Sequence, residues 1–204
     1  ERLDDLLREH LFEPLQMQDT GFCLDPDQQD RLMPMFGVSN IRDLSPMNPP
    51  LEQTLTAIDV AGMYPAANSD FRRGGHGLFS STSDYLKFAT MLLDGKTATG
   101  AVMLSRTMLK MMQANRIPEH QLPLKIGLGP LPGYGWGLTG RVMIDTGQAM
   151  SLTNNGEFGW SGAAATYFWV DPAEAMVGVI MTQYLGSILP MSEALRTAAY
   201  QMLD

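Results

Sequence analysis

Two strand-like segments joined by a short turn constrain the fold of this chain more than any other feature. Residues 157–170 are rich in aromatic and β-branched side chains, and residues 176–182 are almost entirely apolar. The intervening Asp171-Pro172-Ala173-Glu174 has the composition of a tight turn. The sequence therefore predicts a β-hairpin, and the small residues near its start would let backbone N–H groups come close to a ligand.

Helical patterns dominate the residues that precede this hairpin. Leucines at helical spacing, opposite a charged face, predict an amphipathic helix from about residue 2 to residue 12. An N-cap signature at Ser81 and a terminating glycine at Gly95 predict a second, longer helix. Residues 34–50 contain four prolines and are expected to form a long surface loop, a candidate wall of a substrate cleft. Residues 54–64 fit a short helix.

The composition of the last third of the chain predicts a β-sheet. Residues 134–144 have the aromatic and β-branched content of a strand, and with the hairpin they give three predicted strands. Apolar residues at helical spacing over about 190–203 predict a closing helix. Helices that precede an antiparallel meander indicate the α+β class rather than an alternating βα arrangement.

Charge and cysteine content exclude several classes of function. The net charge is −8, whereas a phosphate-binding surface needs clustered lysine and arginine, so no nucleic-acid partner is expected. No run of roughly eighteen apolar residues occurs, so no membrane-spanning helix is expected. The single Cys23 rules out an intramolecular disulfide and leaves the compartment open between a bacterial periplasm and a cytoplasm.

A serine in a glycine-rich setting, Gly159-Trp160-Ser161-Gly162-Ala163, almost matches the nucleophile elbow of α/β-hydrolases. That fold needs its histidine downstream of the serine, and all three histidines of this chain lie upstream. The residues after Ser161 are also strand-like, whereas an elbow leads into a helix. We therefore do not expect Ser161 to be a nucleophile.

The histidines do not suggest a metal site either. His10, His76 and His120 lie far apart in the sequence and lack the spacing of metal-binding motifs, so surface or structural roles are expected. The glycines around His76 do not follow the phosphate-binding loop pattern, and no nucleotide is expected. No metal ion or other cofactor is predicted.

Three passages in order resemble class C β-lactamase-like proteins and the related family VIII esterases. Leu11-Phe-Glu-Pro-Leu-Gln-Met-Gln-Asp-Thr-Gly-Phe22 is similar to the "iFePLGMxdTgF" passage of those proteins, with Gln16 where glycine is usual. Residues 75–95 are similar to their "GGLfSTaeDyarFaqmLlnGG" segment, and residues 156–183 close the match. The resemblance covers nearly the whole chain and implies the β-lactamase/transpeptidase-like fold.

The mechanism of that superfamily uses a Ser-x-x-Lys helix and a Tyr-x-Asn or Ser-x-Asn element, followed by a K-T-G or W-x-G strand. No lysine of this chain has a serine three residues before it, and no tyrosine has an asparagine two residues after it. In such proteins both elements precede the helix that begins this chain. The resemblance therefore implies that the nucleophile and its base are not in this chain.

What the resemblance places in this chain is the third wall of the active site. Trp160-Ser161-Gly162 stands in the K-T-G position, where it would bind substrate. The backbone N–H of Ala163 would then donate to the oxyanion of the tetrahedral intermediate. The alternative is that Gly159 and Gly162 only relieve crowding in a buried strand.

Tryptophan in place of lysine bears on the substrate that the resemblance implies. A lysine would attract the carboxylate of a β-lactam or peptide, whereas Trp160 offers a flat apolar surface. W-x-G at this position is typical of family VIII carboxylesterases. The expected substrate is a small-molecule carboxylic ester, with β-lactam turnover as a secondary activity.

We therefore expect the C-terminal fragment of a two-lobed serine hydrolase. Residues 1–133 would belong mostly to a helical lobe with long loops, and residues 134–204 to the antiparallel strands and C-terminal helix of the α/β lobe. The alternative is a non-catalytic binding or regulatory protein that keeps the fold. A fragment of this kind would expose a strand edge and core surface, so it would need its missing portion, a self-associated partner or crystal contacts to stay soluble.

Overall fold

The structure is a computed structural model and describes residues 2–37, 57–59, 72, 74–126, 129–186 and 190–203. Its elements are, in chain order, α1 (Leu3–Leu7), η1 (Arg8–Phe12), α2 (Pro26–Gln29), β1 (Met35–Gly37), β2 (Ala57–Ile58), α4 (Thr82–Asp94), α5 (Arg106–Gln113), η3 (Glu119–Gln121), β3 (Leu124–Ile126), β4 (Gly129–Leu131), β5 (Tyr134–Trp136), β6 (Arg141–Met143), η4 (Thr146–Gln148), β7 (Phe158–Ser161), β8 (Tyr167–Asp171), β9 (Met176–Ile180), β10 (Tyr184–Leu185) and α6 (Met191–Tyr200). No described helix is long and apolar enough to cross a membrane.

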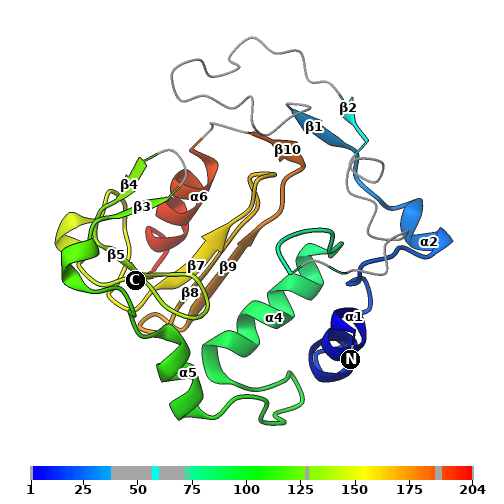
Figure 1. Ribbon diagram of the computed structural model, residues 1–204, viewed down its shortest axis with the longest axis horizontal. Coiled ribbons are helices and arrows are strands. Elements are labelled where there is room, and N and C mark those ends of the chain that lie inside the picture. Colours follow the sequence, from blue (N-terminus) through cyan, green and yellow to red (C-terminus); the bar gives the residue numbers. More distant parts are fainter. Residues whose placement is uncertain are drawn as a thin grey trace.

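An antiparallel meander in the order β5-β6-β7-β8-β9 forms the centre of the molecule (Figure 1). The α+β class and the antiparallel C-terminal strands are therefore confirmed. The number of strands differs from the expectation, because two of the three predicted segments each contain a reversal. Residues 137–140 turn between β5 and β6, where the N–H of Gly137 donates to the carbonyl of Gly140 at 2.8 Å. Residues 162–166 turn between β7 and β8.

Three of the four predicted helices are present, and the ends of α4 follow local chemistry. The hydroxyl of Ser81 accepts a hydrogen bond from the N–H of Asp84 at the start of α4, and Gly95 ends this helix at a φ of +80°. The first predicted helix forms as α1 followed by a π-helical turn, η1. The closing helix is α6.

Helices α4 and α6 cover opposite faces of the sheet (Figure 1). Successive side chains of a strand point to opposite faces, and β8 separates the two helices in this way. The ring of Phe168 contacts Tyr85 of α4 at a centroid distance of 5.4 Å. The neighbouring Tyr167 and Asp171 instead meet Arg196 and Tyr200 of α6. The α4 side is apolar and holds the main hydrophobic core.

The α6 side of the sheet is held by a buried ion pair. Arg196 donates to the carboxylate of Glu157 at 2.7 Å and to the hydroxyl of Tyr134 at 2.8 Å, and the Glu157 side chain is fully buried. Burial alone would lower the pKa of Arg196, but attraction to Glu157 and the hydrogen bond to Tyr134 outweigh it, so the pKa is raised. Arg196 therefore keeps its charge, and its contact with Glu157 fixes α6 to the start of β7.

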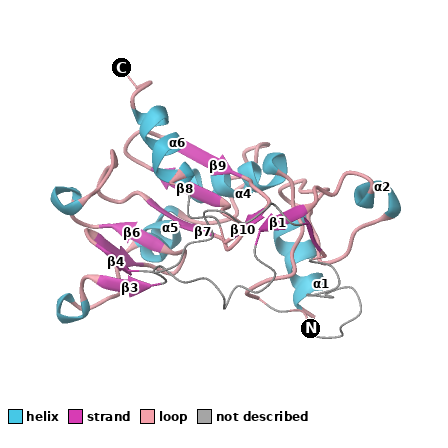
Figure 2. Ribbon diagram, turned by 90° about the horizontal axis from the view of Figure 1, so that it is seen from above, coloured by secondary structure: helices cyan, strands magenta, loops and turns pink. Residues whose placement is uncertain are grey.

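Two smaller sheets flank the meander. Strand β10 pairs in parallel with β1, which pairs with β2, and β3 forms a hairpin with β4. The β3–β4 hairpin lies at one end of the molecule and α2 at the other (Figure 2). The expected loop over residues 34–50 begins with β1 and otherwise lies outside the described residues. The expected helix at 54–64 also lies mostly outside them, and its described part is strand β2. The division into two lobes at residue 133 stays a prediction.

We predict that Arg196→Met will lower the free energy of unfolding of the chain by about 3–5 kcal/mol. The substitution leaves the fully buried Glu157 carboxylate without its closest cation. Urea-induced unfolding at pH 7 measures the change. The double variant Glu157→Gln/Arg196→Met should be less destabilised than Arg196→Met, because it removes the unpaired charge.

The matched control is Arg8→Met, since Arg8 pairs with Asp5 at 2.9 Å while 61% of its side chain is exposed. Removing this surface pair should cost less than about 1 kcal/mol. Equal effects of Arg196→Met and Arg8→Met would contradict the role given to the buried pair.

Candidate functional site

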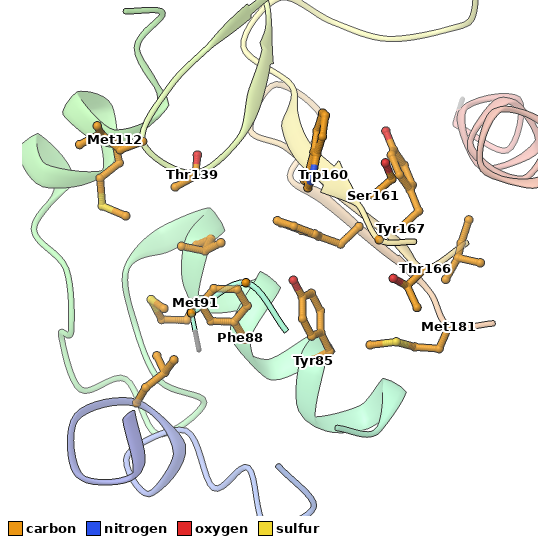
Figure 3. A pocket seen from close by; sticks show the side chains of 18 of the residues that line it. Tyr85, Phe88, Met91, Met112, Thr139, Trp160, Ser161, Thr166, Tyr167 and Met181 are labelled. Atoms are coloured by element: carbon orange, nitrogen blue, oxygen red, sulfur yellow. The ribbon is translucent and has the colours of Figure 1, made fainter. Parts of the chain in front are cut away.

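A cavity of about 940 Å³ lies between the apolar face of the sheet and the helices that cover it. Figure 3 shows its wall, with Tyr85, Phe88 and Met91 of α4 on one side and Trp160 of β7 on the other. Its complete lining in the described residues is His10, Leu11, Gly74, Gly75, Tyr85, Phe88, Met91, Leu92, Met103, Leu104, Met112, Leu138, Thr139, Trp160, Ser161, Gly162, Ala163, Thr166, Tyr167, Phe168, Ile180 and Met181. The four residues singled out from the sequence, Trp160 to Ala163, therefore border one cavity.

No described strand pairs with one edge of β7 at the end that carries these residues. Strand β6 pairs with β7 only as far as Gly159, whereas β8 continues to pair up to Ser161. The N–H of Gly162 then donates to the carbonyl of Thr166 at 2.8 Å, which extends the contact with the β8 side by one residue. Because hydrogen-bonding directions alternate along a strand, the N–H and C=O of Ser161 point away from β8, toward the unpaired edge.

The turn after β7 leaves the amide of Ala163 available. Ala163 is exposed, and its N–H has no hydrogen-bond acceptor among the described residues. The carbonyl of Ala163, by contrast, accepts from the N–H of Gly186 at 3.1 Å. A backbone donor that is fixed, exposed and unused at the rim of a cavity is suited to binding an oxygen atom of a ligand.

Trp160 forms an aromatic wall with a second tryptophan. The rings of Trp160 and Trp136 meet edge to face, with centroids 4.5 Å apart. Trp160 lies opposite Phe168 in the β7–β8 register, so both side chains are on the α4 face. Leu138 and Thr139 of the β5–β6 turn also line the cavity here. The arrangement gives this end of β7 an apolar, uncharged surface.

Ser161 lies at the carboxyl end of β7 and is exposed. Its hydroxyl makes no hydrogen bond to any described residue, and the chain continues through a turn into β8 rather than into a helix. The strand expected after Ser161 is thus confirmed, and the local geometry is not that of a nucleophile elbow.

The two glycines of this segment have different environments. A Cβ on Gly159 would lie 2.1 Å from the carbonyl oxygen of Phe168, so this glycine is required by close backbone packing within the sheet. Gly162 is exposed and lines the cavity, but a Cβ there would lie 2.3 Å from the hydroxyl oxygen of Thr166. Relief of crowding therefore bears on both glycines, against backbone at Gly159 and against one side chain at Gly162.

The described lining contains no lysine or arginine. Burial raises the pKa of Tyr85, which keeps its hydroxyl protonated at neutral pH. Among the described residues, no three or more His, Cys, Asp or Glu side chains gather in a way that would hold a metal ion. Chemically, the arrangement offers a mostly apolar cavity with some hydroxyl groups in its lining and backbone polar groups of β7 at its edge.

Sequence reasoning did not identify the opposite wall of the cavity. Tyr85 and Phe88 belong to the apolar stripe of a helix, a pattern that predicts core packing and not a cavity. His10, expected to have a surface or structural role, also lines the cavity. Nothing in the sequence placed the β5–β6 turn beside Trp160, because that proximity depends on the register of the sheet.

Comparison with known proteins identifies the group to which this fold and cavity belong. The β-lactamase family model matches residues 1–201. The chain belongs to the β-lactamase family. A curated relative in this comparison, Protein Rv1367c of Mycobacterium tuberculosis, is 28% identical over 186 residues, which are 89% of this chain and 43% of the relative.

Solved structures share the fold at lower sequence identity. EstCE1, described as a hydrolase with promiscuous acyltransferase activity, has a TM-score of 0.75 and 22% identity over 98% of this chain and 51% of its own. A variant of simvastatin synthase LovD from Aspergillus terreus has a TM-score of 0.76 and 20% identity over 99% and 52%. A penicillin-binding protein homologue from Caulobacter crescentus has a TM-score of 0.66 and 19% identity over 98% and 52%. The chain spans about half the length of each of these proteins.

We predict that an uncharged fluorescent probe, N-phenyl-1-naphthylamine, will bind the cavity of this chain and quench tryptophan emission. Trp160→Ala should weaken binding about tenfold, because it removes a large apolar contact from the wall. Titration followed by fluorescence measures the affinity. Met150→Ala is the control, since Met150 is 90% exposed and outside the lining. Equal weakening by both substitutions would place the probe elsewhere.

Proposed function

We propose that this chain forms the carbonyl-binding half of a serine hydrolase that acts on uncharged carboxylic esters. The family comprises hydrolases and acyltransferases of the β-lactamase fold. The observation that carries the proposal is the unused, exposed N–H of Ala163 at the rim of an apolar cavity. In this proposal the nucleophilic serine and its lysine belong to a part of a longer protein that these residues do not include.

The N–H of Ala163 would act on the transition state of acyl transfer. When a serine attacks the ester carbonyl, negative charge develops on the carbonyl oxygen, and a fixed N–H donor stabilises that charge without reorganising. A single donor of this kind lowers the activation free energy by about 2.7–4 kcal/mol. The second donor would be the N–H of the attacking serine, as the resemblance to the superfamily implies.

The lining of the cavity favours an uncharged substrate. A carboxylate that enters an apolar cavity loses its hydration, and the described lining offers no lysine or arginine to compensate it. Trp160, packed against Trp136, instead offers an aromatic surface to an acyl group or an alcohol. The hydrolase and acyltransferase descriptions of EstCE1 also support acyl chemistry. We therefore expect esters to be better substrates than β-lactams.

The cavity is also suited to receive the segment that carries the nucleophile. A helix about 10 Å across and two turns long fills a cylinder of roughly 850 Å³, comparable to the cavity. The walls on both sides are apolar, as packing against a buried helix requires. In this arrangement the seated helix would fill the part of the cavity beside α4 and place its serine next to the open edge of β7, and the substrate would bind against Trp160 and Ala163 at the remaining opening.

We predict that the full-length protein will hydrolyse p-nitrophenyl esters of short and medium acyl chains more efficiently than nitrocefin. Steady-state kcat/KM values compare the two. Replacing the serine of an upstream Ser-x-x-Lys motif by alanine should lower ester turnover by at least about a thousandfold, because the acyl-enzyme can no longer form. Full activity after that substitution would refute the mechanism, and a full-length protein without such a motif would favour the binding-protein alternative.

The 204-residue chain by itself should hydrolyse neither p-nitrophenyl acetate nor nitrocefin above the rate of buffer. It would have the oxyanion donor but no activated nucleophile, and the donor stabilises only charge that an attack has created. Mass spectrometry after treatment with a fluorophosphonate provides the second measurement, with Ser161→Ala as its control. Turnover together with a covalent adduct on Ser161 would overturn this expectation.

A further inference from the structure

The direction of the Ala163 N–H is set by the hydrogen bonds of the turn that follows β7. The carbonyl of Gly162 accepts from the N–H of Ala165 at 3.1 Å, inside the turn. In a trans peptide the C=O of one residue and the N–H of the next point in opposite directions. The inward carbonyl of Gly162 therefore directs the N–H of Ala163 outward.

The orientation of the Gly162 carbonyl depends in turn on a second peptide, which joins Ala164 to Ala165. The N–H of Ala165, which binds the Gly162 carbonyl, belongs to the same peptide as the carbonyl of Ala164. That carbonyl points out of the turn and accepts two hydrogen bonds, from the hydroxyl of Thr182 and from the N–H of Tyr184 at 3.3 Å. Hydrogen bonds to the Ala164 carbonyl therefore fix the Ala164–Ala165 peptide and, through the N–H of Ala165, also the Gly162–Ala163 peptide.

The turn needs an external hold because its backbone is unfavourable by itself. Ala165 has a φ of +59°, in the left-handed region that non-glycine residues rarely occupy. The segment that follows β9 supplies the contacts that maintain it, since Thr182 and Tyr184 bind the Ala164 carbonyl and Gly186 binds the carbonyl of Ala163. Among these donors, Thr182 is the one that uses a side chain.

We propose that Thr182 is a positioning residue for the oxyanion donor, acting through the Ala164 and Gly162 peptide planes on the N–H of Ala163. This inference rests on the proposed function of Ala163. Thr182 itself need not touch the substrate, because its hydroxyl is engaged with the Ala164 carbonyl. Its loss would allow the turn to relax and would misalign a donor whose effect depends on direction.

The test compares Thr182→Val with Thr182→Ser in the full-length protein. Valine keeps the shape of threonine and removes the hydroxyl, whereas serine keeps the hydroxyl. We expect Thr182→Val to lower kcat for p-nitrophenyl esters about tenfold with KM changed less than about twofold, and Thr182→Ser to restore most of kcat. Thr97→Val is the matched control, because the Thr97 hydroxyl also bonds to backbone, at the N–H of Ala101, but Thr97 is outside the cavity lining.

Infrared spectroscopy separates positioning from a general structural effect. The acyl carbonyl of a ¹³C-labelled acyl-enzyme stretches at lower frequency when oxyanion donors polarise it. Thr182→Val should shift this band to higher frequency, and Thr182→Ser and Thr97→Val should leave it in place. An unshifted band with normal kcat in Thr182→Val, or equal damage by the valine and serine variants, would overturn the inference.

The outcomes also distinguish this inference from the proposed function. If the wild-type full-length protein forms no acyl-enzyme, the proposed function fails. If it does and Thr182→Val behaves as wild type, only the role of Thr182 fails. Should Thr182→Val not fold, Thr182→Cys provides a weaker donor, and it must then give an intermediate shift of the carbonyl band for the inference to stand.

Discussion

The two strands that flank β7 pair with it over different lengths, and the arrangement of the candidate site depends on this difference. Strand β6 leaves β7 at Gly159, while β8 remains paired beyond it. Had both neighbours continued, the N–H and C=O groups of Ser161 would be bound within the sheet. Because one neighbour stops, the last residues of β7 have a structured side and an open side, and the open side borders the cavity.

One face of the sheet packs against α6, and the other face borders the cavity. On one face the Arg196–Glu157 pair and the Asp171–Tyr200 hydrogen bond attach α6, and burial followed by the bond to Asp171 raises the pKa of Tyr200. On the other face the side chains are apolar and leave space below α4. Glu157 directly precedes β7, so the ion pair fixes the same strand whose far end is open. A functional edge on a strand anchored in this way is held more precisely than one on a free loop.

Local chemistry in the sequence was sufficient for three of the four predicted helices and for the class of fold. Ser81 and Gly95 begin and end α4 as predicted, because capping depends on the residues themselves. The reversal at residues 162–166 was missed, since Gly162-Ala163-Ala164-Ala165-Thr166 contains neither proline nor a glycine at the left-handed position, which Ala165 occupies. The exposure of Ala163 and the cavity beside it could not be predicted from the sequence either, because both depend on strand register and on how α4 packs across the sheet.

The same geometry explains why an oxyanion donor and its nucleophile can belong to separate halves of a protein. A donor contributes only when charge has developed on the carbonyl oxygen, so it must be rigid and correctly directed, but it needs no acid–base partner of its own. Hydrogen bonds to backbone groups can meet that requirement, and in the turn after β7 they hold the carbonyls of Gly162, Ala163 and Ala164 while the N–H of Ala163 faces outward. A nucleophile needs a base at hydrogen-bonding distance, which is easier to arrange within one helix, where residues three apart share a face. On these grounds we propose that the sheet of this chain supplies the donor and that a helix packed against it carries the attacking group.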